Sequence, residues 1–380
     1  MRAAAKLLPK NPDALLSALF EETQNGEQQM ITAPAMYSSP VRVAVAGCGA
    51  VSRLYYAPAL RRLQAAGRLH VEAVFDPDLK AAGIFAKNFT GPRKVSSYGD
   101  LLGKSTELII LASPPEFHPQ QAIDALESGI AVHCEKPLAM SAKDGQLMVE
   151  TAARCNRLLS VGLMRRRFAA TRSIRELLNS KFLGDVTSID IFEGGPFDWP
   201  VASPEYFTRH QSGGGVLLDI GTHVLDLLRW WFGEPLSAVY EDDSMGGVEV
   251  NCRIVLRFRN FDANIRLSRD WARPNRYFIR ATKGWLTWTA NEARSFAVGL
   301  HGASSAAEVL LYHPTNQGIE PALGSAGRDF EFAFDSQLEA TIAALTGQAE
   351  IVSGADALAT LKLIEGCYAT RVPMSAGWML

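Results

Sequence analysis

The sequence predicts an α/β protein, with a doubly wound parallel sheet first and an α+β region with a large, mostly antiparallel open sheet after it. Two observations support this fold class. Between residues 41 and 163, short apolar runs alternate with helical stretches, which is the pattern of βαβ units. Between residues 186 and 290, apolar and polar residues alternate within each run, as in antiparallel strands with one solvated face.

The chain has 380 residues, which exceeds one ordinary hydrophobic core and predicts two domains. Residues 1–39 are polar and, toward their end, rich in Pro and Ser, so we expect an N-terminal extension and linker that is partly disordered. A short helix is plausible within it, over residues 12–24. The first domain then covers residues 40–162 and the second covers residues 163–380.

The composition excludes several classes of protein. The net charge is −2 with both signs mixed along the chain, and no long basic run appears, so nucleic acid is not an indicated partner. The five cysteines are widely spaced with no Cys-x-x-Cys pair, which indicates a reducing compartment and no metal site. No window of roughly eighteen residues is apolar and uncharged, so we expect no membrane span and a cytoplasmic protein.

The elements of the first domain follow from the apolar runs and the turn residues between them. The expected strands are Val41–Ala46, His70–Phe75, Leu108–Ala112, Ile130–Cys134 and Leu158–Leu163. The expected helices are Arg53–Ala66, Leu79–Phe89, Gly99–Leu102, Pro119–Ser128 and Ala142–Cys155. Strands and helices that alternate in this way predict a parallel sheet with helices on both faces.

A glycine-rich turn, Gly47-Cys48-Gly49-Ala50-Val51-Ser52, stands between the first strand and the first helix. A dinucleotide-binding fingerprint requires this context. Gly47 allows the tight turn, and Gly49 lets the backbone approach a pyrophosphate at the helix N-terminus. The third position is Ser52 in place of Gly or Ala, and a serine is small enough to keep the helix close to the strand.

The second strand ends at Asp76, where a ribose-binding carboxylate belongs. A carboxylate at this position accepts hydrogen bonds from ribose hydroxyls and repels a 2′-phosphate. Asp76 therefore favours NAD over NADP as cofactor. Asp76 and Asp78 are also turn formers around Pro77, and both interpretations can hold for Asp76.

Two further strand ends carry candidate site residues. Ser113 and His118 follow the third expected strand, and His118 either seats the cofactor or serves as a helix cap or packing residue. Glu135 and Lys136 follow the fourth expected strand, at the sheet edge where ligands of open α/β sheets bind. Lys136 is therefore a candidate catalytic group. The alternative is that Glu135 and Lys136 are the first solvated residues after a strand.

The second domain begins with an amphipathic helix and continues with runs of strand character. The expected helix is Thr171–Ser180, and the expected strands are Val186–Phe192, Val248–Phe258, Ala263–Ser268, Arg276–Ala281 and Gly284–Ala290. Between the first two of these strands, Phe197-Asp198-Trp199-Pro200 and Tyr206 form an aromatic and polar insertion. Trp199 would suit a sugar face, and a packed loop under the sheet is the alternative.

Three glycines, Gly213-Gly214-Gly215, lead into a predicted helix that ends at Gly233. On this helix, Asp219 and His223 are four residues apart and share one face, with Asp226 three residues further on. An imidazole beside a carboxylate can take a hydroxyl proton while a hydride leaves the carbon. The alternative is a helix N-terminal Asp that stabilises the dipole, with His223 as a core residue.

These motifs together resemble the Gfo/Idh/MocA oxidoreductases, the family of glucose-fructose oxidoreductase and inositol 2-dehydrogenase. The resemblance covers residues 41–372. The segments that carry it are Val45–Ser52, which includes Val51, then Ser113-Pro114-Pro115 with His118, Cys134-Glu135-Lys136-Pro137, Gly213–Gly233, and finally Gly354–Ala357 with Leu363–Glu365. The extension before Val41 is not usual in that family.

The resemblance implies roles for individual residues. Lys136 would contact the nicotinamide ribose and the reacting hydroxyl, His223 would be the acid and base, and Asp219 would orient the substrate. The Lys136-Pro137 bond would be cis. One of Arg165, Arg166 and Arg167 would line the pocket, and the count back from Gly184 favours Arg166. The large sheet would form a homodimer or homotetramer.

The resulting hypothesis is an NAD-dependent oxidoreductase that acts on a secondary alcohol or ketone of a sugar, cyclitol or nucleotide sugar, with no metal. Three rivals remain open. A redox-neutral NAD-dependent glycosidase of the same family would release no net NADH. A non-catalytic nucleotide-sensing regulator would lack the Lys and His pair, which is present here. A binding or scaffold protein would use residues 1–39 to tether a partner.

Overall fold

The computed structural model describes residues 40–198, 213–311, 313–315, 318–320 and 326–374. The predicted extension over residues 1–39, with the helix predicted at residues 12–24, lies outside these residues. Trp199 and Tyr206 lie outside them as well.

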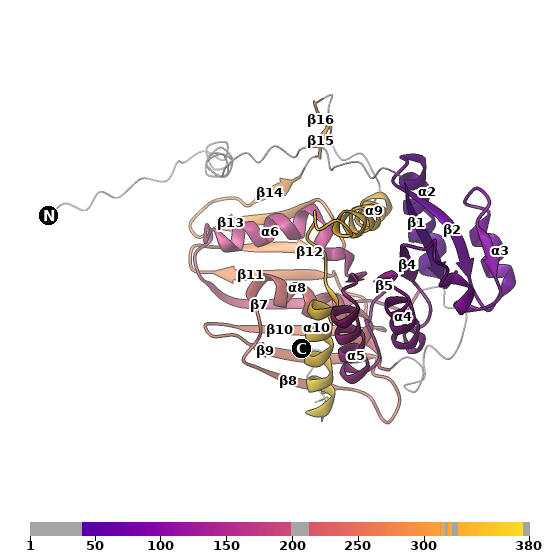
Figure 1. Cartoon of the computed structure of the whole chain (residues 1–380). Helices are drawn as coiled ribbons and strands as arrows, with labels where there is room; N and C mark the ends of the chain where they lie inside the picture. Colours follow the sequence, from indigo (N-terminus) through magenta and orange to yellow (C-terminus); the bar gives the residue numbers. More distant parts are fainter. Residues whose placement is uncertain (1–39, 199–212, 312, 316–317, 321–325, 375–380) are drawn as a thin grey trace. The chain divides into compact units, whose positions relative to one another are not determined.

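The first sheet has six parallel strands in the order β3-β2-β1-β4-β5-β6 (Figure 1). The strands are β1 (Val41–Ala46), β2 (Leu69–Phe75), β3 (Arg93–Val95), β4 (Leu108–Leu111), β5 (Ala131–Cys134) and β6 (Leu159–Val161). All residues of β4, β5 and β6 are buried, as both faces of a parallel sheet are covered by helices. The order reverses direction at β1, so a ligand crevice is expected at the carboxyl ends of β1 and β4.

The helices of this half follow the predicted alternation. They are α2 (Ala57–Ala65), α3 (Leu79–Ala86), α4 (His118–Glu127) and α5 (Ala142–Cys155), with the 3₁₀ turns η3 (Tyr98–Leu101) and η4 (Pro115–Phe117). The first helix does not begin as an α-helix, because the π-helical turn η2 (Ser52–Tyr56) precedes α2. The fold class predicted from the sequence is confirmed for this sheet.

The second sheet has nine strands in the order β14-β13-β12-β11-β7-β10-β9-β8-β17. They are β7 (Val186–Gly194), β8 (Ser237–Asp242), β9 (Asn251–Arg257), β10 (Asp262–Ser268), β11 (Arg276–Ala281), β12 (Gly284–Thr289), β13 (Ser295–Leu300), β14 (Ala307–Leu310) and β17 (Val372–Pro373). Most neighbours are antiparallel, as predicted, but β7 pairs with β10 and β8 with β17 in parallel. A small hairpin, β15 (His313–Thr315) and β16 (Gly318–Glu320), stands apart from this sheet.

The helices described beyond residue 163 are α6 (Ala169–Asn179), α8 (Thr222–Phe232), α9 (Ala326–Ala344) and α10 (Gly354–Ala369), with the 3₁₀ turn η5 (Met164–Arg167) and the π-helical turn η7 (Leu217–Gly221). Of these helices, α9 and α10 pack on elements of the first half. Trp231 of α8 lies edge-on to Tyr277 and Trp288 of the second sheet, with ring centroids 6.2 and 6.3 Å apart. Helix α10 packs against α5 and α8, and α9 packs against α2 (Figure 1). The domain boundaries predicted at residues 39 and 162 stay predictions.

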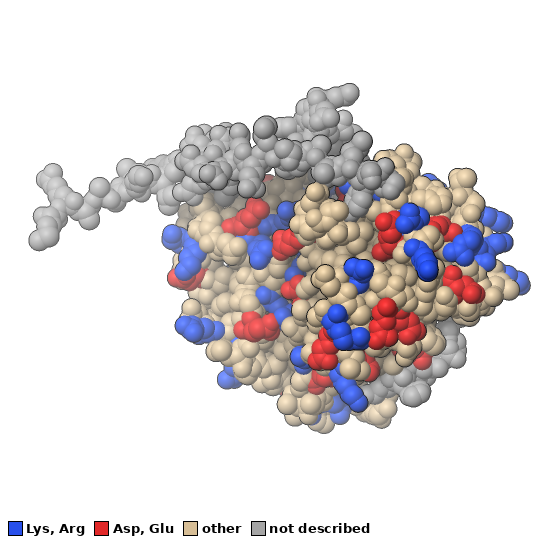
Figure 2. Space-filling view, in the orientation of Figure 1, with Lys and Arg blue, Asp and Glu red and all other residues tan. Residues whose placement is uncertain are grey.

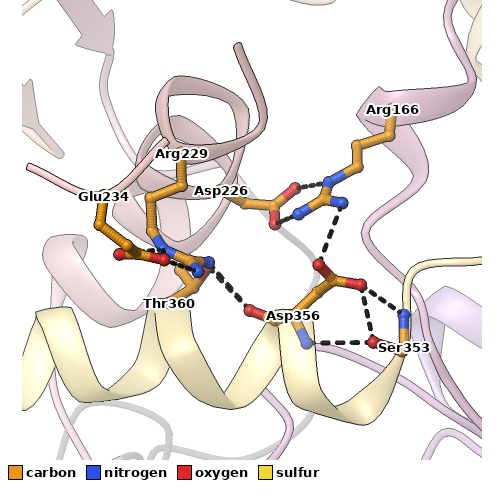
Figure 3. A network of polar contacts seen from close by, with 7 residues as sticks. All are labelled: Arg166, Asp226, Arg229, Glu234, Ser353, Asp356 and Thr360. Carbon is orange, nitrogen blue, oxygen red and sulfur yellow. Dashed lines mark hydrogen bonds and ion pairs between the residues drawn. The ribbon is translucent and has the colours of Figure 1, made fainter. Parts of the chain in front are cut away.

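Arginine and acidic side chains tie η5, α8 and α10 together (Figure 3). Arg166 donates to both carboxylate oxygens of Asp226, at 2.8 and 2.6 Å, and a third nitrogen lies 3.6 Å from Asp356. Arg229 donates to the carbonyl oxygen of Asp356 at 2.9 Å and to Thr360 Oγ1 at 2.7 Å. This network fixes the helix that carries His223.

The surface carries both signs of charge. On the face drawn in Figure 2, basic and acidic residues are interspersed. In the described part of the chain, no helix combines the length and the apolar character that crossing a bilayer requires.

Candidate active site at the edge of the parallel sheet

The glycine-rich turn has one crowded and one open glycine. Gly47 has φ +91°, and a Cβ added to it would lie 2.4 Å from the backbone of Ala112 and Ser113. A Cβ added to Gly49 would meet no atom within 4 Å. The sheet therefore requires glycine at position 47, whereas the space beside Gly49 allows a ligand to approach the backbone. These two positions and the helix start behind them fit a bound dinucleotide.

Ser52 closes the turn from the inside. Its hydroxyl donates to the carbonyl oxygen of Gly47 at 2.6 Å, and the side chain is fully buried. Ser52 therefore preserves close packing of the helix on the strand, as predicted for a small residue. Val51 immediately precedes the π-helical turn η2 and is partly buried.

The Asp76 side chain accepts hydrogen bonds from two backbone N–H groups, one in the glycine-rich turn and one just after β2. One carboxylate oxygen accepts from the Cys48 N–H at 2.8 Å, and the other accepts from the Asp78 N–H at 2.8 Å. Asp76 is therefore a turn former that also ties the glycine-rich turn to β2. Its role toward a ribose stays a prediction.

His118 joins two of the loops at this sheet edge. Its Nδ1 lies 3.0 Å from the carbonyl oxygen of Pro137, and its Nε2 lies 2.9 Å from that of Ser113. Burial lowers the pKa of His118, and the two carbonyl oxygens act in the opposite direction. Because both ring nitrogens face protein carbonyls, His118 holds the loops after β4 and β5 together. Its role toward a cofactor stays a prediction.

Glu135 is a buried carboxylate beneath Lys136, not a solvated residue after a strand. It accepts from the Tyr56 hydroxyl at 2.7 Å and from the Lys136 N–H at 2.9 Å. Burial raises the pKa of Glu135, and these hydrogen bonds act against the rise. Tyr56 also contacts His133 Nε2 at 3.0 Å, so a buried polar network supports the loop. The sequence gives no periodic signal for Tyr56, because it lies in the π-helical turn.

Lys136 and Asp219 meet at the centre of the candidate site. Lys136 Nζ donates to Asp219 Oδ1 at 2.6 Å, and Arg269 pairs with the other oxygen of the same carboxylate. The Lys136-Pro137 bond is cis, as the resemblance implied. Burial lowers the pKa of Lys136 to about 8, which is close to neutrality for an amine. A partly buried lysine with a lowered pKa is typical of an acid, base or electrostatic catalyst.

His223 lies in the turn after Asp219, on the buried side of α8. The side chain is 8 % exposed, and its Nδ1 has no hydrogen-bond partner among the described residues. Burial lowers the pKa of His223 well below its ordinary value, and the charges of Arg165 and Lys136 lower it further. The imidazole is therefore neutral at pH 7. Asp226, in contrast, forms an ion pair with Arg166 and is not part of the contact between Lys136 and Asp219.

The three consecutive arginines have different partners. Arg165 donates to both oxygens of Glu193, at 2.9 and 2.5 Å, and Glu193 also accepts from the Tyr277 hydroxyl at 2.9 Å. Arg166 is engaged by Asp226 and Asp356 instead. The residue count favours Arg166, which stays a prediction. The charge of Arg165 lowers the pKa of both Lys136 and His223, in addition to the larger effect of burial.

Glu193 was not predicted from the sequence, although the alternation of buried residues along β7 indicates that it faces the core. Ile189 and Ile191 are buried on β7, and Glu193 continues the same alternating face with 3 % exposure. A carboxylate at a core-facing strand position requires a cationic partner, and Arg165 supplies it.

The π-helical turn that carries Asp219 is held by Glu249. The Glu249 carboxylate accepts from the N–H groups of Gly215 and Leu217 at 3.0 Å and from the Tyr368 hydroxyl at 2.7 Å. A Cβ on Gly215 would lie 2.0 Å from the Glu249 carbonyl oxygen. The glycine run therefore allows another backbone segment to approach closely. That segment is the connection between β8 and β9, at Glu249, and not a ligand.

Two family models match the chain. The model of the oxidoreductase family with an NAD-binding Rossmann fold matches residues 41–163, and the Gfo/Idh/MocA C-terminal domain matches residues 171–287. The chain belongs to the Gfo/Idh/MocA family. The resemblance noted from the motifs is confirmed.

Named relatives in this family match part of the chain. A D-glucoside 3-dehydrogenase of Escherichia coli strain K12 is 31 % identical over 208 residues, which are 53 % of this chain and 56 % of that protein. An inositol 2-dehydrogenase of Corynebacterium glutamicum strain R is 25 % identical over 204 residues, 53 % of this chain and 57 % of that protein. The chain thus spans little more than half the length of these relatives.

Solved structures match over more of the chain. A levoglucosan dehydrogenase in complex with NADH and levoglucosan has a TM-score of 0.75 and 18 % identity, and the match covers 87 % of this chain and 97 % of that one. A 3-ketoreductase from Actinomadura kijaniata in complex with NADP has a TM-score of 0.73 and 21 % identity, over 88 % and 99 % of the two chains. At these identities the likeness establishes the fold.

Proposed function

We propose that the chain is an NAD(P)-dependent oxidoreductase that interconverts a secondary alcohol and a ketone on a sugar, a cyclitol or a nucleotide sugar. The observation that supports this most directly is the contact between Lys136 and Asp219. It brings the loop after β5 of the parallel sheet against the turn that leads to His223.

The residues divide the work of the reaction. In the oxidation direction, the neutral imidazole of His223 accepts the hydroxyl proton, because burial keeps it unprotonated at pH 7. The ammonium of Lys136 stabilises the negative charge that develops on the oxygen. Asp219 orients the substrate. The positive charge of Arg165 acts on both Lys136 and His223.

The turn around Gly47 and Gly49 would hold the pyrophosphate, and Asp76 would face the ribose. A nicotinamide, when bound, supplies the hydride acceptor or donor. Asp76 favours NAD, since a 2′-phosphate would be repelled by its carboxylate. Both NADH and NADP occur in the structural neighbours. For this chain we propose NAD.

A sugar-like substrate agrees with the names of the relatives, which include a D-glucoside dehydrogenase, an inositol dehydrogenase and a 1,5-anhydro-D-fructose reductase. We further propose that Arg166, Trp199 and Tyr206 contribute to substrate binding. Assembly as a homodimer or homotetramer through the second sheet is also proposed.

A redox-neutral glycosidase is the second candidate, because the same Lys136 and His223 would serve oxidation and re-reduction within one turnover. A panel of free sugars, inositols, glycosides and nucleotide sugars, incubated with purified protein and NAD, separates the two. Net NADH formation from a polyol supports the dehydrogenase. Glycoside cleavage without net NADH supports the glycosidase, and failure to bind NADH or NADPH at all would rule out both.

A further inference from the structure

Asp219 is paired with two cations, one at each carboxylate oxygen. Its Oδ1 accepts from Lys136 Nζ at 2.6 Å, and its Oδ2 is paired with the guanidinium of Arg269. The three side chains are similarly exposed, at 21 % for Lys136 and 24 % for the other two. In a partly desolvated site, a carboxylate that loses one of two cations remains neutralised by the other.

Arg269 is anchored independently of Lys136. Its guanidinium carbon lies 5.2 Å from the centroid of the Phe197 ring, within the range of a cation–π contact. Its backbone N–H donates to the Val250 carbonyl oxygen at 2.9 Å, and its own carbonyl oxygen accepts from the Phe197 N–H at 3.0 Å. Since Arg269 directly follows β10, the sheet and Phe197 together determine where its positive charge lies.

The charge of Arg269 acts on Lys136. Burial is the largest cause that lowers the pKa of Lys136, Arg269 and Arg165 lower it further, and Glu135 and Glu193 oppose them. Among the residues that the structure describes, the charged or titratable groups that act on or contact the ammonium include Glu135 beside it in the chain, Arg165 on η5, Glu193 on β7, Asp219 on η7, His223 on α8 and Arg269 after β10.

We propose that Arg269 is a positioning residue for the Lys136 and Asp219 pair: it keeps Asp219 in place and neutralised while the ammonium of Lys136 turns to the oxygen of a bound substrate. This inference rests on the proposed function, because that oxygen is the hydroxyl or ketone oxygen of the hydride transfer. Without Arg269, the departure of Lys136 would remove both of these cations from Asp219, and the cost would hold the ammonium in the ion pair.

Competitive labelling of the full chain with acetic anhydride tests the shared pairing without cofactor or substrate. The labelling of Lys136 is measured by mass spectrometry across a pH series. In Arg269→Gln, the midpoint for Lys136 is expected to rise by about one pH unit, because a neighbouring positive charge is lost. Arg273→Gln is the matched control. Arg273 lies in the same loop, with its guanidinium carbon 3.8 Å from the centroid of the Trp271 ring. In this variant the labelling midpoint of Lys136 is expected to equal that of the parent.

Thermal melting verifies that each variant is folded. If Arg269→Gln does not fold, Arg269→Met carries the same test, since its unbranched apolar stem still packs on Phe197. An unchanged midpoint in the folded variant, or an equal shift in Arg273→Gln, would overturn the pairing.

The release of Lys136 is tested in turnover of the polyol that the parent oxidises. Arg269→Gln is expected to keep parent affinity for NADH and to lose about tenfold in kcat/KM. Undiminished kcat/KM would overturn the release step. A parent chain without any oxidoreductase turnover, but with the midpoint shift intact, would instead refute the proposed function and leave the ion-pair assignment standing.

Discussion

Lys136 and Asp219 form an ion pair with 2.6 Å between Nζ and Oδ1, although 83 residues separate them in the sequence. The pair joins the loop after β5 to the π-helical turn η7. One residue comes from the edge of the parallel sheet and the other from the glycine-led segment of the second part, so the candidate site exists only when both halves are folded together.

Replacement of Lys136 tests its role in the chemistry. Lys136→Ala is expected to lower kcat by about 10²–10³, because in the proposed reaction the developing alkoxide would lose the stabilising charge of the Lys136 ammonium. Affinity for NADH, measured by fluorescence titration, is expected to stay near that of the parent. Lys143→Ala, an exposed lysine of α5, serves as control and should turn over normally. Parent turnover in Lys136→Ala would exclude the assignment.

Gly47 and Gly49 offer a matched pair of substitutions in one turn. Gly47→Ala is expected to lose about 1–3 kcal/mol of stability, because its Cβ would collide with the Ala112 and Ser113 backbone. Gly49→Ala meets no atom and should melt like the parent, yet bind NADH about tenfold more weakly. Thermal melting and fluorescence titration measure the two effects. Equal NADH affinity in Gly49→Ala would move the dinucleotide away from this turn.

Asp76 is expected to set the preference between the two nicotinamide cofactors. Asp76→Asn keeps an acceptor for the Cys48 N–H but removes the charge, so the ratio of NADPH to NADH dissociation constants should fall toward one. Asp78→Ala removes only the N-cap contact to the Lys80 N–H. It is expected to cost about 1 kcal/mol of stability and to leave the ratio unchanged. A ratio that does not move in Asp76→Asn assigns ribose recognition to another residue.

His133 gives the stability of the protein a predictable pH dependence. Burial lowers the pKa of His133 to about 3, with Arg167 as a second cause. Between pH 6.5 and 3 the unfolded chain therefore binds a proton that the folded chain does not, and stability falls as the pH falls. His133 contributes a slope of about 1.4 kcal/mol per pH unit in this window.

Urea unfolding at several pH values between 6 and 4 measures that slope. His133→Gln is expected to show a free energy of unfolding that depends less steeply on pH than the parent does, and His70→Gln, an exposed histidine on β2, should retain the parent slope. A His133→Gln slope equal to that of the parent contradicts this prediction.

Local patterns predicted much of the fold. The bounds predicted for α5 and β11 agree with the structure to the residue, because Ser141 caps α5 and β11 alternates cleanly between buried and exposed positions. Strand β3 was missed because Arg93 and Lys94 make a short, charged edge strand with no apolar pattern. The π-helical turns were also missed, since one inserted residue leaves the apolar spacing almost unchanged.

The candidate site was predictable only where a motif marked it. Lys136, Asp219 and His223 stand in recognisable segments, and the structure brings Lys136 and Asp219 into contact. Arg269 and Tyr56 carry no motif, because their importance depends on pairing with residues far away in the chain. Which arginine of three consecutive ones faces inward depends on the geometry of a single turn, which residue counting does not give.

Helix α10 packs against α5 of the first half, and its cap Ser353 forms an isolated β-bridge with Ser160, the middle residue of β6. During synthesis on the ribosome, the parallel sheet therefore emerges long before the segment that shields its outer helix. The flank of α5 that α10 covers in the folded chain stays exposed until residue 369 has left the exit tunnel.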